Sequence, residues 1–437
     1  MRQHYKAVFL SECGLTDSVL AEQLVGLCTD GASCMLGQFS GVAKLMKEKC
    51  PLLHSIHCMA HRLELATKNA VDNVNEVSHF RSFIDELYKI YSMSPKNQAE
   101  LQCIADTLAI ELMKVKKVFD LRWVFSSFVA VRSVLRDYPA LFKHFLTLSE
   151  QSQSSRSSKE KSKFKGLAKK LRSWFLLSET CMLKDTLRVL KQLSLNLQKN
   201  EAHVMSAMDH IDRDKEQLLA LKVQPGKTLA KFWRSYENDG KFKDVDIVQT
   251  DNDLQKFSFF RAQFLQALYD NLCQRFPCTD VLSAARALCP QSWPSDVLER
   301  ALFGQSDIAF LCKAFLLDSD LSADVMLQFT IYKRQGVPGA QLSKLIKLLE
   351  VLPISSAECE RGFSQMNLYH TAPRNRLLTD SVSDLMMVGI NGPPLKHWNA
   401  VKYVVSWLQS GKHGALDTPT GVPKKPITMH KSHQLFL

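Results

Sequence analysis

The sequence lacks several features that would place the protein in a membrane, a secretory pathway or a zinc-ligated class. It has no apolar run close to the ~20 residues of a membrane-spanning helix, so we expect no membrane partner. Its first residues, MRQHYK, are too polar for a secretory signal peptide. No C-x-x-C pair occurs among its twelve cysteines, and no RING-like pattern of cysteine and histidine follows. The scattered cysteines, mostly in apolar stretches, predict reduced thiols in an intracellular protein.

The composition is that of a soluble globular protein with an excess of positive charge. The 437 residues are enough for about two or three domains, and 46% of them are apolar. Lysine and arginine exceed the acids by 56 to 44, which gives a net charge of +12. This excess is compatible with a nucleic-acid partner.

Strand-like and helical segments alternate at the start of the chain, and helical patterns dominate afterwards. Short strands are expected at residues 5–10, 24–29 and 52–58, with a helix between Thr16 and about Leu24. Helical spacing begins near Val77 and continues over most of residues 100–350. The leucine stripe of 183–197 and the phenylalanine and leucine stripe of 260–272 are typical of core packing.

One low-complexity segment interrupts this helical region. Residues 151–158 are rich in serine, and residues 156–172 carry eight lysines or arginines against one glutamate. Because serine removes packing and like charges repel, we expect a mobile basic loop over 151–172. A solvated face and a phosphate-binding face are both compatible with that charge.

Four short motifs contain residues that could do chemistry. Asp30 follows the apolar run of residues 24–28 and precedes Gly31, where a carboxylate can cap a turn or hold a metal ion. His54, His57, Cys58 and His61 form an H-x-x-H-C-x-x-H pattern, but the distant second ligand pair of a zinc site is missing. Alternate residues of a strand also point to opposite faces, which speaks against four converging ligands.

The other two motifs lie at helix starts. In the stretch Asp120-Leu121-Arg122-Trp123, Trp123 is most simply a core residue and Arg122 its neighbour in solvent. In VLPISSAECERGFSQMN, residues 351–367, Pro353 ends one helix and the two serines can cap the next. Glu360 lies three residues before Phe363, so an inward Phe363 would place this acid at the edge of a buried surface.

Taken in order, TDGAS, C-x-x-H, R-W and SSAECERGFS resemble the motifs of the hAT superfamily of transposases and the genes domesticated from them. The resemblance covers about residues 15–145 and 340–410. It implies an RNase H-like mixed sheet, interrupted by a large all-helical insertion and followed by a helical dimerisation region. The expected class is therefore α+β or mostly α, with an incomplete sheet.

The resemblance also assigns roles to individual residues. Asp30 matches the second catalytic aspartate and Glu360 the catalytic glutamate, which hold two Mg²⁺ ions in that family and should therefore lie close together. Cys58 and His61 match its C-x-x-H pair, and Trp123 the tryptophan at the transposon-end hairpin. The candidates for DNA contact are Arg122, Trp123, Lys159, Lys161, Lys163 and Lys165.

The first catalytic aspartate has no counterpart, which separates this chain from an active enzyme. Among the acids before Asp30, neither Glu12 nor Asp17 ends an apolar strand. No zinc finger precedes them, so the chain is expected to be a piece of a longer protein or a truncated domesticated relic. We expect no cofactor; Mg²⁺ would enter only if upstream sequence completed the site.

Three functions are compatible with these observations. The preferred one is a non-catalytic, transposase-derived nuclear protein that dimerises and binds DNA or chromatin. An active hAT transposase would need an upstream aspartate. A vertebrate member of the group is known as a SUMO ligase, so a SUMO ligase-like regulatory role is a further alternative. The expected dimer interface includes Leu385, Met386, Val404, Trp407 and Leu408.

The expected organisation has four parts. A partial RNase H-like core covers residues 1–115, and a helical insertion covers residues 116–340. The dimerisation region covers residues 341–412, and a flexible tail covers residues 413–437.

Overall fold

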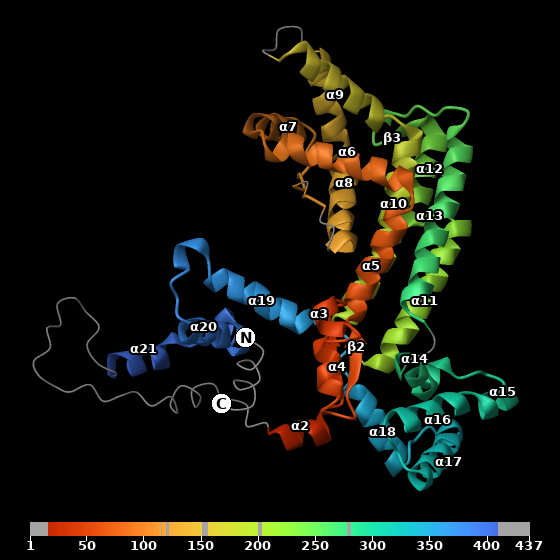
Figure 1. Cartoon of the computed structure of the whole chain (residues 1–437). Helices are drawn as coiled ribbons and strands as arrows, with labels where there is room; N and C mark the ends of the chain where they lie inside the picture. The colour runs from red at the N-terminus through yellow and green to blue at the C-terminus, as the bar shows by residue number, and fades with distance from the viewer. Residues whose placement is uncertain are drawn as a thin grey trace, which may run out of the picture. The chain divides into compact units, whose positions relative to one another are not determined.

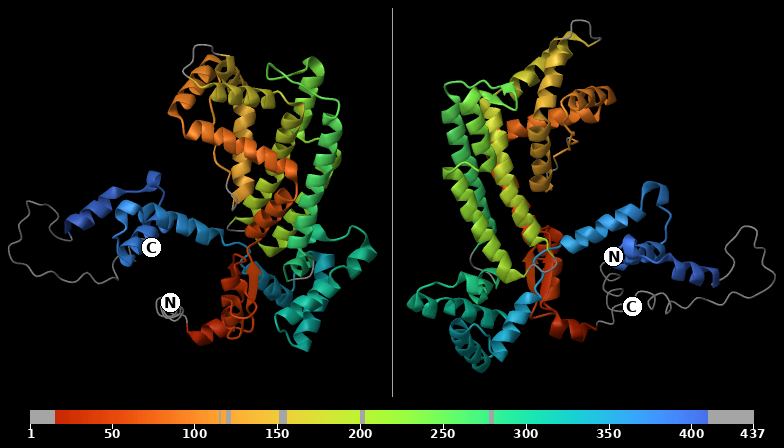
Figure 2. Two further views of the ribbon diagram at one scale, coloured as in Figure 1. Left: turned by 45° about the horizontal axis from the view of Figure 1, so that its top comes forward. Right: turned by 180° about the vertical axis from the view of Figure 1, so that it is seen from behind.

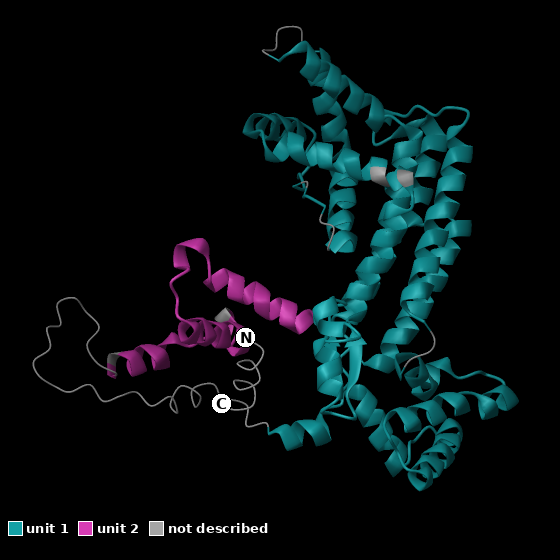
Figure 3. Ribbon diagram, in the orientation of Figure 1, with its two compact units in different colours: residues 1–356 teal, residues 357–437 magenta. Residues whose placement is uncertain are grey.

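A computed structural model describes residues 16–114, 116–118, 122–150, 156–199, 203–277 and 281–409. It divides the chain into two compact units, Met1–Ser356 and Ala357–Leu437, which we call unit 1 and unit 2 (Figure 3). Over the described ranges, no helix combines the length and the apolar character needed to cross a bilayer. The four-part organisation expected from the sequence stays a prediction, as does the tail, which lies outside the described residues.

Unit 1 begins with short elements that match the sequence pattern. The Thr16 hydroxyl accepts a hydrogen bond from Val19 N and caps the first described helix, as expected. The elements are α2 (Asp17–Gln23), β1 (Gly26–Thr29), α3 (Ser33–Leu36), α4 (Val42–Lys47) and β2 (His54–His57). The strands expected at 24–29 and 52–58 are thereby confirmed, whereas the one at 5–10 lies outside the described residues.

The two strands form a parallel pair. Gly26 lies opposite His54 and Thr29 opposite His57, and α3 and α4 connect the strands. Gly26 packs so closely on Pro353 that an added Cβ would lie 2.5 Å from the proline ring. Among the described residues this sheet has two strands, so the structure confirms the mostly helical class and leaves the RNase H-like core as a proposal.

Long helices build most of unit 1 (Figures 1 and 2). They are α5 (Met59–Asp72), α6 (Asn75–Ser92), α7 (Pro95–Thr107), α8 (Trp123–Glu150), α9 (Ser158–Leu171), α10 (Trp174–Leu197), α11 (Val204–Val223), α12 (Lys227–Asp239) and α13 (Asp253–Arg275). Both predicted stripes are buried, with Leu183 to Leu197 on α10 and Phe260 to Leu272 on α13. Helices α10, α11 and α13 run side by side.

The basic segment is a helix over most of its length, which corrects the prediction of a loop. Ser157 and Glu160 form a reciprocal capping box that starts α9. Phe164, Leu167 and Leu171 are buried against the rest of unit 1, mainly α8. Three large apolar side chains on one face stabilise the helix enough to overcome the repulsion among its lysines. Residues 151–155 lie outside the described ranges.

A short hairpin, β3 (Lys241–Phe242) and β4 (Val245–Asp246), interrupts the helices. Its two turn residues, Lys243 and Asp244, have φ of 49° and 65°. The Lys243 ammonium donates to the Leu135 carbonyl oxygen at 2.6 Å. Pro139, four residues on in α8, has no N–H for that carbonyl. The hairpin therefore satisfies a backbone group that the proline leaves open.

The rest of unit 1 is a group of shorter helices. They are α14 (Val281–Ala284), the 3₁₀ turns η2 (Ala285–Leu288) and η3 (Pro290–Ser292), α15 (Val297–Leu302), α16 (Gln305–Ala314), α17 (Ser319–Gln335) and α18 (Ala340–Glu350). The expected helix end before Pro353 is confirmed. Lys333 on α17 donates to the carbonyl oxygens of Ala301 and Phe303, at the C-terminus of α15.

Unit 2 consists of α19 (Ala357–Tyr369), α20 (Thr379–Asn391) and α21 (Ala400–Gln409), with the 3₁₀ turns η4 (Ala372–Arg374) and η5 (Leu395–His397). Helices α19 and α20 pack on each other. Among the side chains that the structure describes in this unit, only Ala357 is buried. Unit 2 thus has apolar helix faces without a buried core over its described part.

Helix α12 illustrates a cap supplied by another helix. Its first residues follow Gly226, which has no side chain, and the Asp185 carboxylate of α10 accepts from Thr228 N at 2.8 Å and Leu229 N at 3.0 Å. An added Cβ at Gly226 would lie 2.5 Å from an oxygen of Asp185. The glycine therefore gives the carboxylate access to the helix end.

We predict that Asp185→Ala lowers the free energy of unfolding by about 1–3 kcal/mol, because the buried amide of Leu229 and the part-buried amide of Thr228 lose their acceptor. Urea unfolding at pH 7 measures this change. Asp324→Ala, which removes an exposed carboxylate on α17, is the control and should leave the midpoint unchanged. Equal midpoints for both variants would contradict the capping role.

Candidate functional site

The C-x-x-H motif lies where β1, β2, α5 and residues 354–356 meet. Cys58 directly follows β2 and precedes α5, and its amide donates to the Thr29 carbonyl oxygen at 2.8 Å. The amide of Met59 donates to the Ile354 carbonyl oxygen at 2.9 Å. Segments almost 300 residues apart in sequence are thereby joined through one short stretch of backbone.

The Cys58 thiol is surrounded by hydrogen-bonding groups. Its side chain is 1% exposed, and its sulfur accepts from Ser356 N at 3.4 Å and lies 3.9 Å from Ser355 Oγ. A hydrogen bond from the Cys28 side chain, followed by those from Ser356, outweighs burial and lowers the pKa of Cys58 to about 4. The site therefore favours a thiolate.

Helix α5 holds this motif against two long helices by charged side chains. The Arg62 guanidinium donates to the carbonyl oxygen of Arg275, the last residue of α13, and lies 4.7 Å from the Phe276 ring centroid. The Glu64 carboxylate accepts from Val124 N, in the first turn of α8, at 3.2 Å. A cation at a helix C-terminus and an anion at an N-terminus both complement the helix dipole.

His57 and His61 lie on either side of Cys58 in sequence, with ring centroids 5.5 Å apart. The His57 ring covers Gly31, where an added Cβ would lie 2.5 Å from its Cε1. Burial, then the charges of His61 and Arg62, lowers the pKa of His57 to about 4. His54 instead packs edge-on against Phe315 at 4.8 Å.

These side chains do not make a metal site. Across the described residues, no group of three or more His, Cys, Asp or Glu side chains is placed to hold an ion. A zinc ion needs four such ligands, and Mg²⁺ needs several oxygens. The residues around the motif therefore do not fit either metal, and the expectation that the chain uses no cofactor stays a prediction.

Asp30 lies in the turn after β1 and is exposed. Its Oδ1 accepts from Ala32 N at 3.3 Å, a local hydrogen bond typical of aspartate in turns. That contact agrees with the structural interpretation of the motif. Glu360 is exposed on α19 of unit 2, so the expected approach of Glu360 to Asp30 stays a prediction. Phe363 is 62% exposed, so the condition under which Glu360 would lie at the edge of a buried surface is not met.

The two residues of the R-W motif lie in different environments, one buried and one exposed, as their simplest interpretation predicts. Trp123 is 3% exposed at the start of α8, as expected for a core residue, and its assignment as a DNA contact stays a prediction. Its indole N–H finds no acceptor among the described residues. Arg122 is exposed beside it.

The lysines of α9 lie outside its buried face, and all of them except Lys161 are exposed. Lys163 and Lys170 come within 3.5 and 3.6 Å of the Glu86 carboxylate. Lys159, Lys165 and Lys169 are exposed and form no ion pair with a described residue, and Lys161 is half-buried. The helix thus presents positive charge to solvent from a fixed scaffold.

The predicted interface residues of unit 2 fall on two helices. Leu385 and Met386 on α20 are half-buried, whereas Val404 and Trp407 on α21 are 49% and 51% exposed. Val401 and Val405 extend the same face of α21. Leu408 lies in α21, and its side chain is not described. A continuous apolar face of this kind is typical of an interaction surface.

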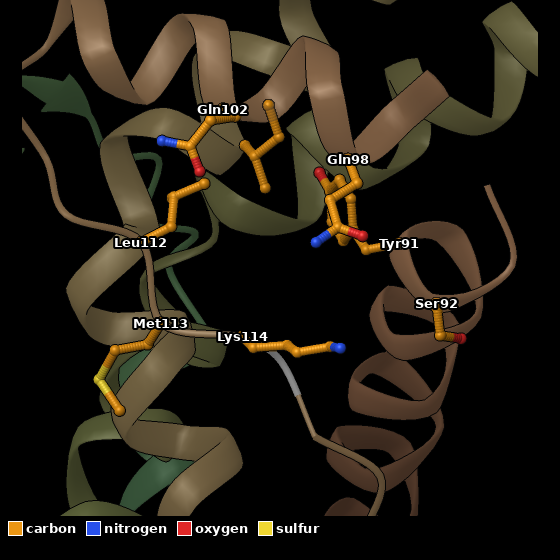
Figure 4. Close-up of a pocket in the computed structure, with 8 residues that line it drawn as sticks. Tyr91, Ser92, Gln98, Gln102, Leu112, Met113 and Lys114 are labelled. Atoms are coloured by element: carbon orange, nitrogen blue, oxygen red, sulfur yellow. The ribbon is translucent and has the colours of Figure 1, made fainter. Parts of the chain in front are cut away.

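A cavity of about 140 Å³ lies between α6, α7 and residues 112–114 (Figure 4). Its described lining includes Tyr91, Gln98, Gln102 and Lys114, and no carboxylate, cysteine or histidine. It therefore offers hydrogen-bonding groups and one ammonium, without a carboxylate or imidazole beside them. No known family model matches the chain.

Several residues at this site have no signal in the sequence. Cys28 reaches Cys58 only because the parallel register places both on one side of the sheet. Ser355 and Ser356 were expected to act as helix caps. In the structure the Ser355 hydroxyl and the Ser356 amide also contact the Cys58 sulfur. Arg62 and Glu64 resemble ordinary surface charges on a helix. Only their distant partners in α13 and α8 give them a role.

We predict that His57→Gln makes the protein less sensitive to acid. The pKa of His57 is lowered from 6.5 to about 4, so its contribution to stability is complete above pH 6.5 and is lost as pH falls through 4. Glutamine does not titrate, so thermal unfolding of the variant should change less than wild type between pH 7.5 and 4.5.

His79→Gln, at an exposed position on α6, is the control for this prediction. It should retain the acid sensitivity of the wild type. If His57→Gln retains it as well, burial of His57 is not its source.

Proposed function

We propose that the chain is a non-catalytic, hAT transposase-derived nuclear protein that binds DNA or chromatin and self-associates. The observation that carries this proposal is the basic face of α9. Lysine side chains on a helix that is packed against a core are positioned to contact successive phosphates at low entropic cost. The net charge of +12 adds long-range attraction to the same partner.

The absence of catalysis rests on the carboxylates available. Two-metal phosphoryl transfer needs acidic side chains that bridge two ions about 4 Å apart. Asp30 already accepts a backbone hydrogen bond within its turn, and cationic Arg62 and Arg275 act on neighbouring His57. Such surroundings favour an anion over a divalent cation, which supports a binding role for a former catalytic motif.

Self-association rests on the surface of unit 2. Its described helices expose Val401, Val404, Val405 and Trp407 on α21 and Val388 on α20. Apolar side chains that find no core in their own unit are stabilised by a partner surface, and a second copy offers the same helices. A homodimer is therefore the partner that the proposal names.

We predict that replacing Lys159, Lys165 and Lys169 together with glutamine weakens binding to duplex DNA. The dependence of log affinity on log salt should flatten by about 1 for each lysine that contacts a phosphate. Fluorescence anisotropy with a labelled duplex, at several salt concentrations, measures this slope. Glutamine retains helix propensity, so α9 should persist.

The matched control replaces Lys313, Lys344 and Lys347, exposed lysines of α16 and α18, with glutamine. Both triple variants lower the net charge equally, so a general charge effect would change both slopes alike. An unchanged slope for the α9 variant would show that this face is merely solvated.

We predict that the chain is a dimer at micromolar concentration and that Val404→Asp shifts it toward monomer. A buried carboxylate at an apolar interface costs several kcal/mol unless it is paired. Light scattering coupled to size-exclusion chromatography gives the mass. Ser406→Asp adds the same charge two residues away on α21 and should remain dimeric.

A monomeric wild type with a folded circular dichroism spectrum would contradict self-association. Dissociation by both aspartate variants would indicate a charge effect rather than a specific apolar interface.

A further inference from the structure

Cys28 and Cys58 form a pair of thiols across the parallel strands. Cys28 lies opposite Ile56 in the strand register, and Cys58 comes two residues after Ile56. Side chains alternate along a strand, so Cys28 and Cys58 emerge on the same face as diagonal neighbours. Their side chains are within hydrogen-bonding reach of each other.

The surroundings of the pair favour thiol chemistry over inert packing. The Cys58 sulfur accepts from Ser356 N at 3.4 Å and stands at the N-terminus of α5, a helix of 14 residues. Backbone amides and a helix N-terminus both stabilise a thiolate, which is the nucleophilic form. Cys28 is half-buried, so a small oxidant has access to the pair although Cys58 itself is 1% exposed.

We propose that Cys28 and Cys58 are a redox pair that a peroxide converts to a reversible intramolecular disulfide, and that this bond releases residues 354–356 from the Cys58 sulfur. The inference concerns regulation of the chain and does not depend on DNA binding or on dimerisation.

The chemistry balances with hydrogen peroxide as the oxidant. The Cys28 thiol first transfers its proton to the Cys58 thiolate, and the Cys28 thiolate formed in this way attacks one peroxide oxygen. The O–O bond breaks and hydroxide leaves, so Cys28 becomes a sulfenic acid. Cys58 sulfur then attacks the Cys28 sulfur, the S–O bond breaks, and the thiol proton of Cys58 leaves with the oxygen as water. Two electrons pass from the two sulfurs to the peroxide, and a dithiol reductant reverses the step.

The structural consequence falls on the segment that leads into unit 2. In the reduced protein the Cys58 sulfur contacts Ser355 Oγ and accepts from Ser356 N, the two residues directly before Ala357. A sulfur in a disulfide carries no negative charge and is a weaker acceptor, and it must also turn toward Cys28. The amide of Ser356 then loses its acceptor, so this segment becomes more mobile.

The test uses the full chain and hydrogen peroxide, followed by denaturing alkylation and peptide mass spectrometry. We expect a Cys28–Cys58 cross-linked peptide pair that disappears after dithiothreitol. Cys28→Ser should abolish the cross-link, whereas Cys103→Ser, at an exposed cysteine of α7, should retain it. Hydrogen exchange should become faster at residues 355–356 on oxidation of the wild type, but not of Cys28→Ser.

Two outcomes would overturn the proposal. In one, Cys28 and Cys58 both remain free thiols under peroxide that oxidises Cys103. In the other, the disulfide forms without any change in exchange at residues 355–356, which removes the proposed release. Cys58→Ser could destabilise the junction, so Cys28→Ser is the deciding variant, and its circular dichroism spectrum verifies that it is folded.

Discussion

The structure of unit 1 depends on α5 and on two of its charged side chains, Arg62 and Glu64, which lie two residues apart in the sequence. Arg62 closes the C-terminus of α13, and Glu64 closes the N-terminus of α8. Because both bonds come from one helix, they fix the positions of the two long helices relative to the strand pair that α5 follows. Charge-assisted hydrogen bonds of this kind are stronger than neutral ones, and losing one would leave a helix end unsatisfied.

The same principle recurs across unit 1. Asp185 caps α12, Gln328 accepts from the amides of Gln341 and Leu342 at the start of α18, and Lys333 closes α15. In each case the cap comes from a different helix. Helices that cap one another can form stable ends only when they are packed together, so capping and packing become one cooperative event.

This arrangement explains which elements the sequence could predict. Helix α2 follows Thr16, where the cap is local, and the stripes of α10 and α13 repeat every three or four residues. The start of α12 follows Gly226, and no residue near Gly226 in the sequence predicts that Asp185 caps this helix. The error at 151–172 has a different cause. Composition favoured a loop, whereas the spacing of Phe164, Leu167 and Leu171 already had the period of an amphipathic helix.

The candidate site follows the same division between local and distant information. Local pattern gave a turn as one of two roles for Asp30 and favoured the core for Trp123, and alternation along a strand argued against a zinc site. What the pattern could not give is the parallel register that brings Cys28 to Cys58, or the return of Ser356 to the same sulfur. One cysteine thus connects the first strand to the residues before unit 2. The Cys58 sulfur accepts from the Ser356 amide, as the Asp185 and Glu64 carboxylates accept from amides at helix starts, so the C-x-x-H motif is a structural junction in unit 1.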